Sequence, residues 1–278
     1  MIWLNGRLLA RDRAHVDPAD RGLLLADGLF ETLRAYRGHL FKLEDHLQRL
    51  SGAAAELGIP LPLDPPAIAA AATETLAANQ LDTADAALRI TLTRGPGQRG
   101  LLPPKDPLPN LLITAVAYQP PPPTDGLIAM TASQVTRNEG SITARLKTLS
   151  YLDNILALRQ AAAVGSDEAL LLNNKGRIAC GARSNVFAMV KGRLLTPAIG
   201  EGALPGITRH AVLGLCASLE IAVEEAEITR EQLREATEVF VTNSLMEVAP
   251  VRRLDDKELP VAPVTKRLMD AYAASTPR

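Results

Sequence analysis

The spacing of apolar residues predicts alternating strands and helices in the first half of the chain. Short runs rich in Leu, Ile, Val and Thr, bounded by Gly, Pro or Asn, predict strands. Apolar residues at helical spacing, stopped by Gly58 or opened by two prolines, predict helices. The expected elements are a hairpin at 2–9, a strand at 29–36 turned into 39–43, helices at 44–57 and 65–79, and strands at 87–93 and 110–118.

The second half of the chain also contains both strand-like apolar runs and apolar residues at helical spacing. The expected elements are an extended segment at 127–135, helices at 151–163, 207–219 and 264–274, and strands at 168–172, 177–180, 184–190, 193–195, 221–228 and 238–241. Several strands follow one another as in hairpins, with helices between the groups. This order predicts an α+β protein rather than a doubly wound parallel sheet.

A proline run marks the expected domain boundary. Four consecutive prolines follow Gln119, and Gly126 closes the segment. A proline run favours an extended, semi-rigid spacer. At 278 residues the chain is long enough for two domains. We therefore expect a small N-terminal α+β domain at 1–118, a linker at 119–126 and a larger C-terminal α+β domain at 127–278, which would carry Lys147.

The amino-acid composition indicates which classes of molecule the protein binds. The chain is 47% hydrophobic and 22% charged with a net charge of −1, so it lacks the basic footprint of a protein that binds nucleic acid or an anionic membrane. No apolar run reaches the ~20 residues of a membrane span, and the N-terminus has no signal-peptide pattern. The two cysteines lack metal-ligand spacing. We expect a cytoplasmic protein that acts on small molecules and has no structural metal site.

Lys147 is the first candidate for chemistry. It is one of only seven lysines among 30 basic residues, and it lies among apolar and small residues just before the helix expected at 151. Burial can remove the charge of a lysine and make its amine a Schiff-base nucleophile. The alternative is a solvated surface charge, the usual role of a lysine.

Three other segments have the chemistry to bind phosphate. A helix expected after Pro205-Gly206 would offer its first amides, a strand is followed by small polar residues, and a helix near residue 46 carries His46 and Arg49 on one face. An arginine can bind a phosphate through two hydrogen bonds. The alternatives are an ordinary helix start, a strand-ending turn and a solvated helix face. The candidate groups are the Arg49 guanidinium, the amides of Ile207 and Thr208, and the small polar residues at 242–244.

Together these segments resemble the class IV aminotransferase family. That family consists of fold type IV pyridoxal-phosphate (PLP) enzymes and includes branched-chain and D-amino-acid aminotransferases and 4-amino-4-deoxychorismate lyase. The resemblance covers nearly the whole chain and implies the two-domain, D-amino-acid-aminotransferase-like fold. The markers that carry it are DGLFET at 27–32, HLQRL at 46–50, TRG at 93–95, RLK at 145–147, GARSNVF at 181–187, GITR at 206–209 and TNS at 242–244.

The resemblance implies a role for each candidate residue. Lys147 would bind PLP covalently and catalyse the reaction. The phosphate would contact Arg49, Ile207, Thr208, Asn243 and Ser244. Tyr151 would lie close to the ring oxygen, and Phe30 and Thr32 would line the substrate side. Arg99 would bind a substrate carboxylate, with a mobile surface charge as its alternative. The substrate would be a small amine or amino acid, and the enzyme would be a homodimer.

Cys180 departs from the family pattern. Members usually have a glutamate at this position, which pairs with the pyridine nitrogen of PLP and keeps it protonated. A neutral thiol cannot supply that charge, so the ring should be a weaker electron sink. The alternative is a small buried side chain in a site that has lost activity.

This departure affects the expected reaction. Transamination depends heavily on a protonated pyridine, whereas elimination of pyruvate to leave an aromatic ring has its own driving force. Segments 94–100 and 242–247 also look more like the lyases. The sequence therefore favours conversion of 4-amino-4-deoxychorismate to 4-aminobenzoate and pyruvate, a step in folate biosynthesis. The alternatives are an aminotransferase for branched-chain or D-amino acids and a degenerate PLP-fold binding protein.

Overall fold

The computed structural model describes residues 1–119 and 126–277, which form two compact units. The first unit holds Met1–Gln119, Leu146–Ser150 and 276–277, and the second holds 126–145 and Tyr151–Ser275. The linker expected at 119–126 falls outside the described residues except for its two ends. Each unit has its own sheet and helices, which confirms the α+β class.

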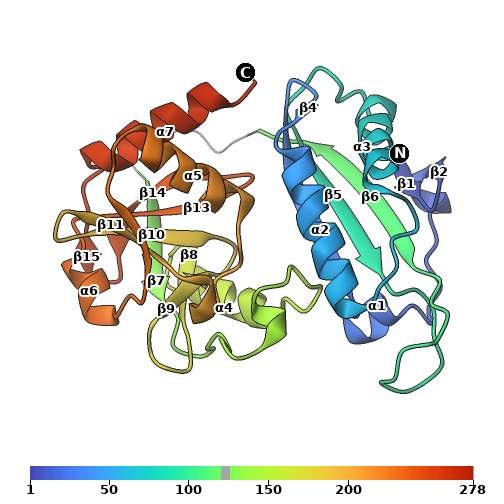
Figure 1. The fold of residues 1–278 in the computed structure, drawn as a ribbon, viewed down its shortest axis with the longest axis horizontal. Helices are drawn as coiled ribbons and strands as arrows, with labels where there is room; N and C mark the ends of the chain where they lie inside the picture. Colours follow the sequence, from blue (N-terminus) through green and yellow to red (C-terminus); the bar gives the residue numbers. More distant parts are fainter. Residues whose placement is uncertain (120–125, 278) are drawn as a thin grey trace. The chain divides into compact units, whose positions relative to one another are not determined.

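The first unit is built on a six-stranded sheet in the order β2-β1-β6-β5-β3-β4. Helices α2 and α3 pack against this sheet and against each other (Figure 1). The elements are β1 (Ile2–Leu4), β2 (Arg7–Leu9), η1 (Arg11–Arg13), α1 (Arg21–Leu25), β3 (Gly28–Tyr36), β4 (His39–Leu40), α2 (Leu43–Leu57), α3 (Pro65–Ala78), β5 (Ala86–Thr93) and β6 (Asn110–Ala117).

The two faces of β3 have different roles. Leu29 and Leu33 belong to the apolar core together with Leu47 and Leu50 of α2. Because strand side chains alternate, Phe30 and Thr32 lie on the opposite face. Helix α2 ends at Gly58, which has φ +61 and donates to carbonyls of the last turn, so glycine there is the expected helix stop.

The segment that carries Lys147 belongs to the first unit, which corrects the expectation that it lies in the C-terminal domain. The amide of Phe30 donates to the Lys147 carbonyl at 2.9 Å, and the amide of Leu149 donates to the Gly28 carbonyl at 3.0 Å. A β-bridge pairs Leu29 with Thr148. This short strand-like segment therefore satisfies the backbone groups of β3, although about 120 residues separate the two in sequence.

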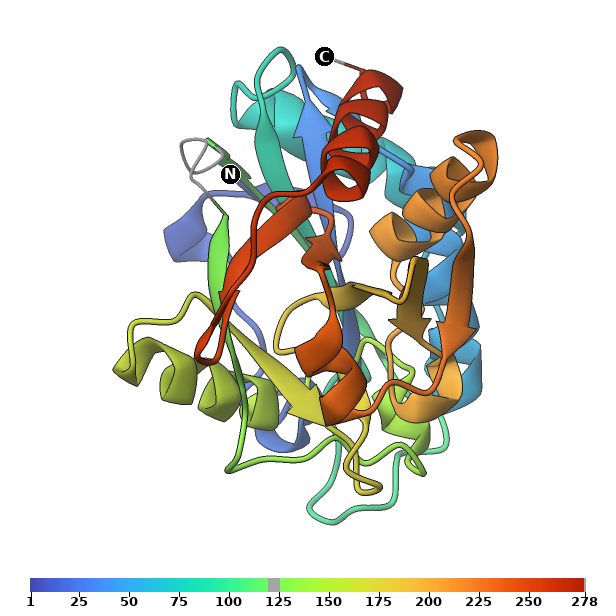
Figure 2. The same cartoon turned by 90° about the vertical axis from the view of Figure 1, so that its left-hand side faces the viewer.

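The second unit contains a sheet in the order β12-β11-β10-β13-β14-β7-β8-β9, with β15 paired to β14. Figure 2 shows α4 beside β8 and α7 beside the β13–β14 pair. The elements are β7 (Leu127–Thr131), η2 (Ile142–Ala144), α4 (Leu152–Ala163), β8 (Glu168–Leu172), β9 (Ile178–Gly181), β10 (Asn185–Val190), β11 (Arg193–Pro197), η3 (Ile199–Glu201), α5 (Ile207–Ser218), β12 (Val223–Ala226), α6 (Arg230–Glu235), β13 (Glu238–Asn243), β14 (Glu247–Leu254), β15 (Lys257–Glu258) and α7 (Pro263–Ser275).

Strand β14 and helix α6 of the second unit escape the sequence prediction, as do the two-residue β15 and the short 3-10 helices η2 and η3. Strand β14 contains Pro250 and two arginines, so its sequence lacks the apolar alternation of a strand. Helix α6 is six residues long, too short for periodicity to be read, and its only clear signal is the capping box of Thr229 and Gln232. Residues 247–254 form a strand because they pair with β13 on one side and β7 on the other.

In the described part of the chain, no helix is both long and apolar enough to span a bilayer.

Candidate active site

Lys147 lies next to Phe30 and Arg89 in the first unit. Its Nζ is 4.4 Å from the centre of the Phe30 ring, and the Arg89 guanidinium carbon is 3.8 Å from the same centre. Arg89 is directly opposite Thr32 in the β3–β5 ladder, so both project from the same face of the sheet as Phe30. Because both side chains contact the same aromatic ring, the positive charge of Arg89 lies close to the amine of Lys147, the candidate nucleophile.

A buried carboxylate orients the predicted phosphate ligand Arg49. Glu31 is 1% exposed and accepts hydrogen bonds from Arg49 Nε at 2.8 Å and Nη2 at 2.6 Å. His46 Nδ1 donates to the same carboxylate at 2.7 Å, since a carboxylate can only accept. The expectation that His46 and Arg49 share a helix face is confirmed. Their common partner fixes the plane of the guanidinium.

The ionisation of this cluster follows from its burial. Burial alone would raise the pKa of Glu31, but the hydrogen bonds from His46 and Arg49 outweigh it and lower the pKa to about 2. Burial lowers the pKa of His46; Glu31 opposes this shift, while the charges of Arg49 and Lys147 add to it. The Glu31 carboxylate is therefore charged at neutral pH, and the neutral form of His46 is favoured.

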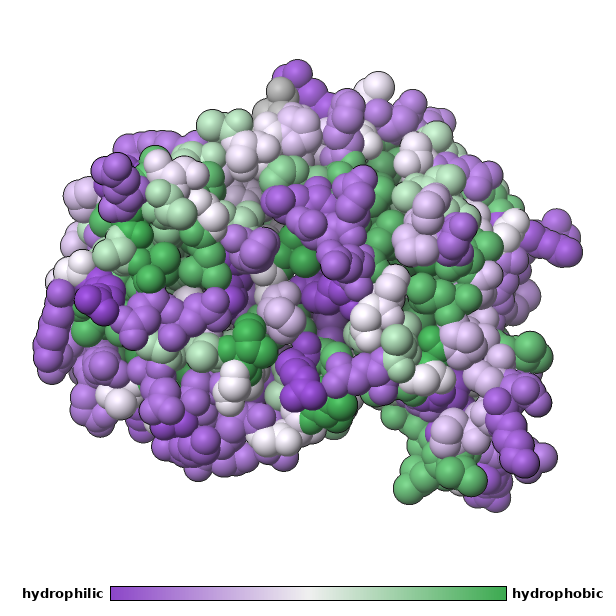
Figure 3. Space-filling model, in the orientation of Figure 1, coloured by the Kyte–Doolittle hydropathy of each residue, from purple (hydrophilic) through white to green (hydrophobic). Residues whose placement is uncertain are grey.

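Arg99 lies in the exposed loop that connects β5 to β6. The same loop carries Leu101, Leu102 and Leu108, which are 82%, 89% and 73% exposed. This loop protrudes at the lower right of Figure 3, where hydrophobic side chains lie beside hydrophilic ones. An exposed set of leucines this dense is unusual for a surface that faces only water.

The two segments of the second unit that were predicted to bind phosphate lie side by side. Strands β10 and β13 pair Asn185 with Thr242, and Asn185 Nδ2 donates to the Leu204 carbonyl just before α5 at 2.9 Å. A Cβ on Gly206 would overlap the Asn185 side-chain oxygen, so the chain needs glycine there. One asparagine thus joins the end of β13 to the start of α5.

The start of α5 and the end of β13 leave polar groups open. Helix α5 begins at Ile207 with Gly206 as its N-cap and no side-chain cap, so its first amides keep the positive end of the helix dipole open. Thr208 is 4% exposed. Among the described residues, the Thr242 Oγ1 atom is buried without a hydrogen-bond partner. An anion bound here would satisfy donors that the fold leaves open.

Asn243, Ser244 and Tyr151 occupy defined positions in the second unit. The Asn243 side chain accepts from the amides of Leu245 and Met246 at 2.9 and 2.7 Å and donates to the Arg183 carbonyl, so it builds the turn after β13. Ser244 is half-buried within that turn. Tyr151 is the half-buried N-cap residue of α4.

Cys180 lies beside a buried carboxyl group and close to an arginine. Glu168 is completely buried; it accepts from the amides of Ala169 and Ala182 and from Ser184 Oγ at 2.8 Å. Burial raises the pKa of Glu168. Burial also raises the pKa of the Cys180 thiol to about 11, with Arg137 opposing the rise and Glu168 adding to it. The thiol is therefore protonated and neutral, as the sequence predicted.

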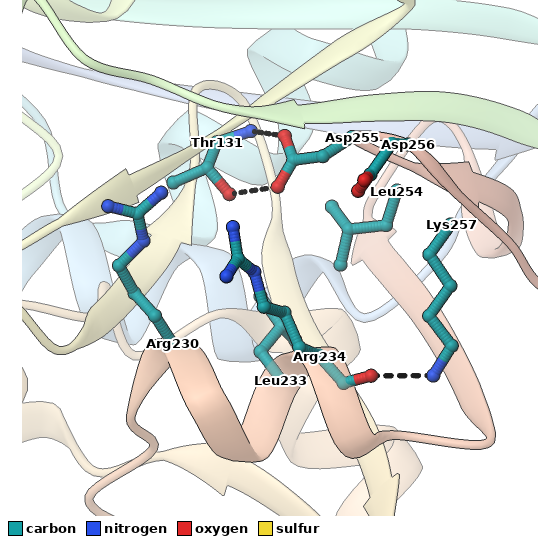
Figure 4. A pocket seen from close by; sticks show the side chains of 8 residues that line it. All are labelled: Thr131, Arg230, Leu233, Arg234, Leu254, Asp255, Asp256 and Lys257. Carbon is teal, nitrogen blue, oxygen red and sulfur yellow. Dashed lines mark hydrogen bonds between the residues drawn. The ribbon is translucent and has the colours of Figure 1, made fainter.

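A hollow elsewhere in the second unit has a structural explanation. Asp255 accepts from the amide and hydroxyl of Thr131, and Lys257 Nζ donates to the Arg234 carbonyl at 2.6 Å (Figure 4). The same amine donates to the Ala236 carbonyl at 2.7 Å. The lysine caps the end of α6. None of the residues predicted from the sequence to be functional lines this hollow.

Sequence reasoning missed Glu31, Arg89, Asn185 and Glu168. Glu31 interrupts a mostly apolar strand and Glu168 begins another, and a charged residue in such a position is a signal for a buried pair or hydrogen-bond acceptor. Arg89 could have been found by aligning β3 with β5, because the register places it opposite Thr32. Asn185 lies within the quoted motif at 181–187, yet only the structure gives it a partner.

Comparison with known proteins shows the family of this chain. The family model for amino-transferase class IV matches residues 28–254. A Methanocaldococcus jannaschii protein assigned as a branched-chain-amino-acid aminotransferase is 36% identical over 98% of this chain and 94% of its own. The D-alanine aminotransferase of Bacillus licheniformis is 31% identical over 99% of this chain and 96% of its own.

Solved structures extend the comparison to both expected reactions. The branched-chain amino acid aminotransferase of T.th., solved with pyridoxamine 5'-phosphate, superposes with a TM-score of 0.90 at 27% identity, covering 98% of this chain and 92% of that one. The 4-amino-4-deoxychorismate lyase of Pseudomonas aeruginosa superposes with a TM-score of 0.86 at 30% identity, covering 99% of both chains. The chain therefore belongs to the class IV aminotransferase family of PLP-dependent enzymes.

Proposed function

We propose that this enzyme transfers an amino group between a branched-chain or D-amino acid and a 2-oxo acid. The observation that carries the proposal is the match over 98% of the chain to the M. jannaschii protein assigned as a branched-chain-amino-acid aminotransferase. The match to a D-alanine aminotransferase over a similar length supports the D-amino-acid alternative. These relatives favour transamination over the lyase reaction that the sequence first suggested.

The proposal assigns the cofactor contacts to residues whose geometry fits them. The open start of α5 and the unpartnered Thr242 hydroxyl suit a phosphate dianion. PLP, when bound, supplies the electron sink for negative charge on the substrate carbon next to nitrogen. Lys147 Nζ would hold the cofactor and then carry the proton to and from that carbon. The phosphate would contact Arg49, Ile207, Thr208, Asn243 and Ser244, Tyr151 would contact the ring oxygen, and Cys180 would face the ring nitrogen.

The substrate contacts in this proposal come from one face of the first sheet. Phe30 and Thr32 lie on this face of the sheet and would line the substrate side. Arg89 contacts the ring that Lys147 also contacts, so its guanidinium is placed to bind a carboxylate near the reacting amine. Arg99 would bind a carboxylate from the β5–β6 loop.

We also propose that the enzyme is a cytoplasmic homodimer. The exposed leucines of the β5–β6 loop, together with Leu23, Leu24 and Leu25 of α1 at 69%, 62% and 45% exposure, support a covered interface in the working protein. Exposed apolar groups of this density are typical of protein contact surfaces.

The two half-reactions test the proposed function directly. Adding L-leucine, L-valine or D-alanine to the PLP-loaded protein should shift its absorbance to that of the pyridoxamine form. Adding 4-methyl-2-oxopentanoate or pyruvate should restore the original spectrum. Protein without added amino acid is the control. A spectrum that stays unchanged with every amino acid of both classes would contradict the proposal.

The second candidate is the lyase, which Cys180 and the superposition on the P. aeruginosa lyase favour. A neutral thiol opposite the ring nitrogen should slow transamination more than elimination, because only transamination relies heavily on a charged ring. Incubation with 4-amino-4-deoxychorismate distinguishes the two: release of both 4-aminobenzoate and pyruvate would support the lyase.

Replacing Cys180 with glutamate should raise the rate of amino-group transfer about tenfold or more, because a carboxylate can hold the ring nitrogen protonated. Cys180→Ser is the matched control, since a hydroxyl is also neutral, and it should leave the rate within about threefold. Steady-state transfer rates of the three proteins provide the measurement. A Cys180→Glu protein that binds PLP but transfers no faster would show that the thiol does not limit the reaction.

A further inference from the structure

The loop that carries Arg99 is longer than an ordinary hairpin connection. It runs from the end of β5 at Thr93 to the start of β6 at Asn110, and in sequence it contains Gly95, Gly97 and Gly100. A connection of 16 residues without regular structure is uncommon, and glycines add to the conformational freedom that it must lose. Arg99 can bind a substrate in a fixed place only if something orders this loop.

A buried arginine from another segment holds the middle of the loop. Arg21 is 5% exposed, and its guanidinium donates to three successive carbonyls: Gly100 at 3.0 Å, Leu101 at 2.8 Å and Leu102 at 3.5 Å. A Cβ on Gly97 would lie 2.9 Å from Arg21 Cδ, so the arginine side chain passes directly over this glycine. The loop therefore wraps around one charged group.

Arg21 is itself fixed by Asp27. Arg21 Nε donates to Asp27 Oδ2 at 2.8 Å, and Arg94 Nε donates to the same oxygen at 2.8 Å. Burial would raise the pKa of Asp27, but the bonds from Arg94 and Arg21 lower it overall. The carboxylate therefore stays charged, and its two arginines stay paired, across the neutral pH range.

Backbone hydrogen bonds complete the attachment on the other side of Arg99. The amide of Arg21 donates to the Gly95 carbonyl at 2.9 Å, and the amide of Gly97 donates to the Ala19 carbonyl at 3.2 Å. Arg99 thus lies between an anchor at residues 95–97 and a second anchor at residues 100–102. Its backbone is held on both sides while its side chain stays exposed.

We propose that Arg21 is a positioning residue for substrate recognition: by holding the carbonyls of residues 100–102, it places Arg99 to bind the substrate carboxylate. This inference rests on the proposed function, in which the substrate is a carboxylic acid. Arg21 itself does not contact the substrate. Its effect reaches the substrate through the loop backbone and the guanidinium of Arg99.

Arg21→Lys is the first test, because lysine keeps the charge and the Asp27 pair but cannot bind three carbonyls at once. Arg94→Lys is the matched control: Arg94 is also buried and also binds Asp27, but it holds the carbonyls of Leu57 and Gly58. Hydrogen exchange of the amide of residue 97, which donates to the Ala19 carbonyl, should accelerate at least tenfold in Arg21→Lys and stay unchanged in Arg94→Lys. Equal exchange in the two variants would overturn the inference.

Substrate binding gives the second measurement, made by calorimetry with 4-methyl-2-oxopentanoate on PLP-loaded protein. We expect Arg21→Lys and Arg99→Ala each to weaken binding about tenfold, and the double variant to bind no more weakly than Arg99→Ala alone. Independent, multiplying effects would show that Arg21 does not act through Arg99. Retained binding without any amino-group transfer would count against the proposed function and leave the role of Arg21 intact.

Gly97→Ala covers the case in which Arg21→Lys does not fold. The added Cβ would push Arg21 aside without removing its charge. It should produce the same faster exchange of the residue 97 amide and the same loss of binding. Normal exchange and binding in a folded Gly97→Ala protein would contradict the inference.

Discussion

Replacing Lys147 with alanine is expected to lower the kcat/KM of amino-group transfer by at least about 10⁴-fold, because the same amine is proposed to hold the cofactor and to carry the proton. The backbone should remain in place, since the segment is held by hydrogen bonds of the Lys147 carbonyl and the Leu149 amide to β3. Steady-state kinetics of the purified variant, together with its circular dichroism, provide the measurement.

Lys191→Ala is the matched control for this change. Its side chain is 82% exposed and lies 3.7 Å from Glu235, so its loss should leave the rate within about twofold. Borohydride treatment of the unsubstituted protein should fix the cofactor on the peptide that contains Lys147. A label on any other lysine, or a Lys147→Ala protein with more than about a hundredth of the normal rate, would defeat the assignment.

Replacing Glu31 with glutamine is expected to reduce the free energy of unfolding at pH 7 by about 3 kcal/mol. The carboxylate is buried and its pKa is lowered to about 2 by His46 and Arg49, so the folded protein stabilises its charged form. The substitution leaves the Arg49 charge without its partner in a buried site. Denaturant unfolding of both proteins gives the difference, and the weakened orientation of Arg49 should also lower PLP affinity.

The pH dependence of this difference has a definite sign. A carboxyl group with a depressed folded pKa contributes stability above its unfolded value of about 4.5, and this contribution disappears as the pH falls toward the folded value of about 2. The difference between the two proteins should therefore be constant from pH 7 to about 5.5 and shrink to less than half by pH 3.

Glu235→Gln is the control for the chemical change alone. Glu235 lies in an exposed pair with Lys191, so its loss should cost no more than about 0.5 kcal/mol at any pH. A Glu31→Gln protein as stable as this control, or one whose deficit grows as the pH falls, would contradict the pairing described for Glu31.

Most elements of the fold could be predicted because their signals are local. Helix α2 was expected at 44–57 and runs from Leu43 to Leu57, and β5 was expected at 87–93 and runs from Ala86 to Thr93. Apolar spacing and Gly58 suffice for such elements. Strand β14 could not be predicted, because pairing with β13 and β7 holds it despite Pro250.

The candidate site also has features that single segments of the sequence reveal and features that they do not. A scarce lysine in an apolar frame, a Pro-Gly turn before a helix and a thiol in place of a carboxylate are properties of single segments, and the sequence alone established them along with the family resemblance. The sequence did not decide the reaction: it favoured the lyase, whereas the relatives that match the whole chain are aminotransferases.

Only the tertiary structure showed which candidate side chains have partners in distant segments of the chain. It paired the segment of Lys147 with β3, which lies more than a hundred residues earlier in the chain. It also paired Glu31 with Arg49 and joined Arg21 to the loop of Arg99. Chain pairing and burial create these contacts, and neither has a signature at a fixed sequence spacing. The sequence by itself therefore determined which side chains are available for chemistry, and the fold decided which partner each one has.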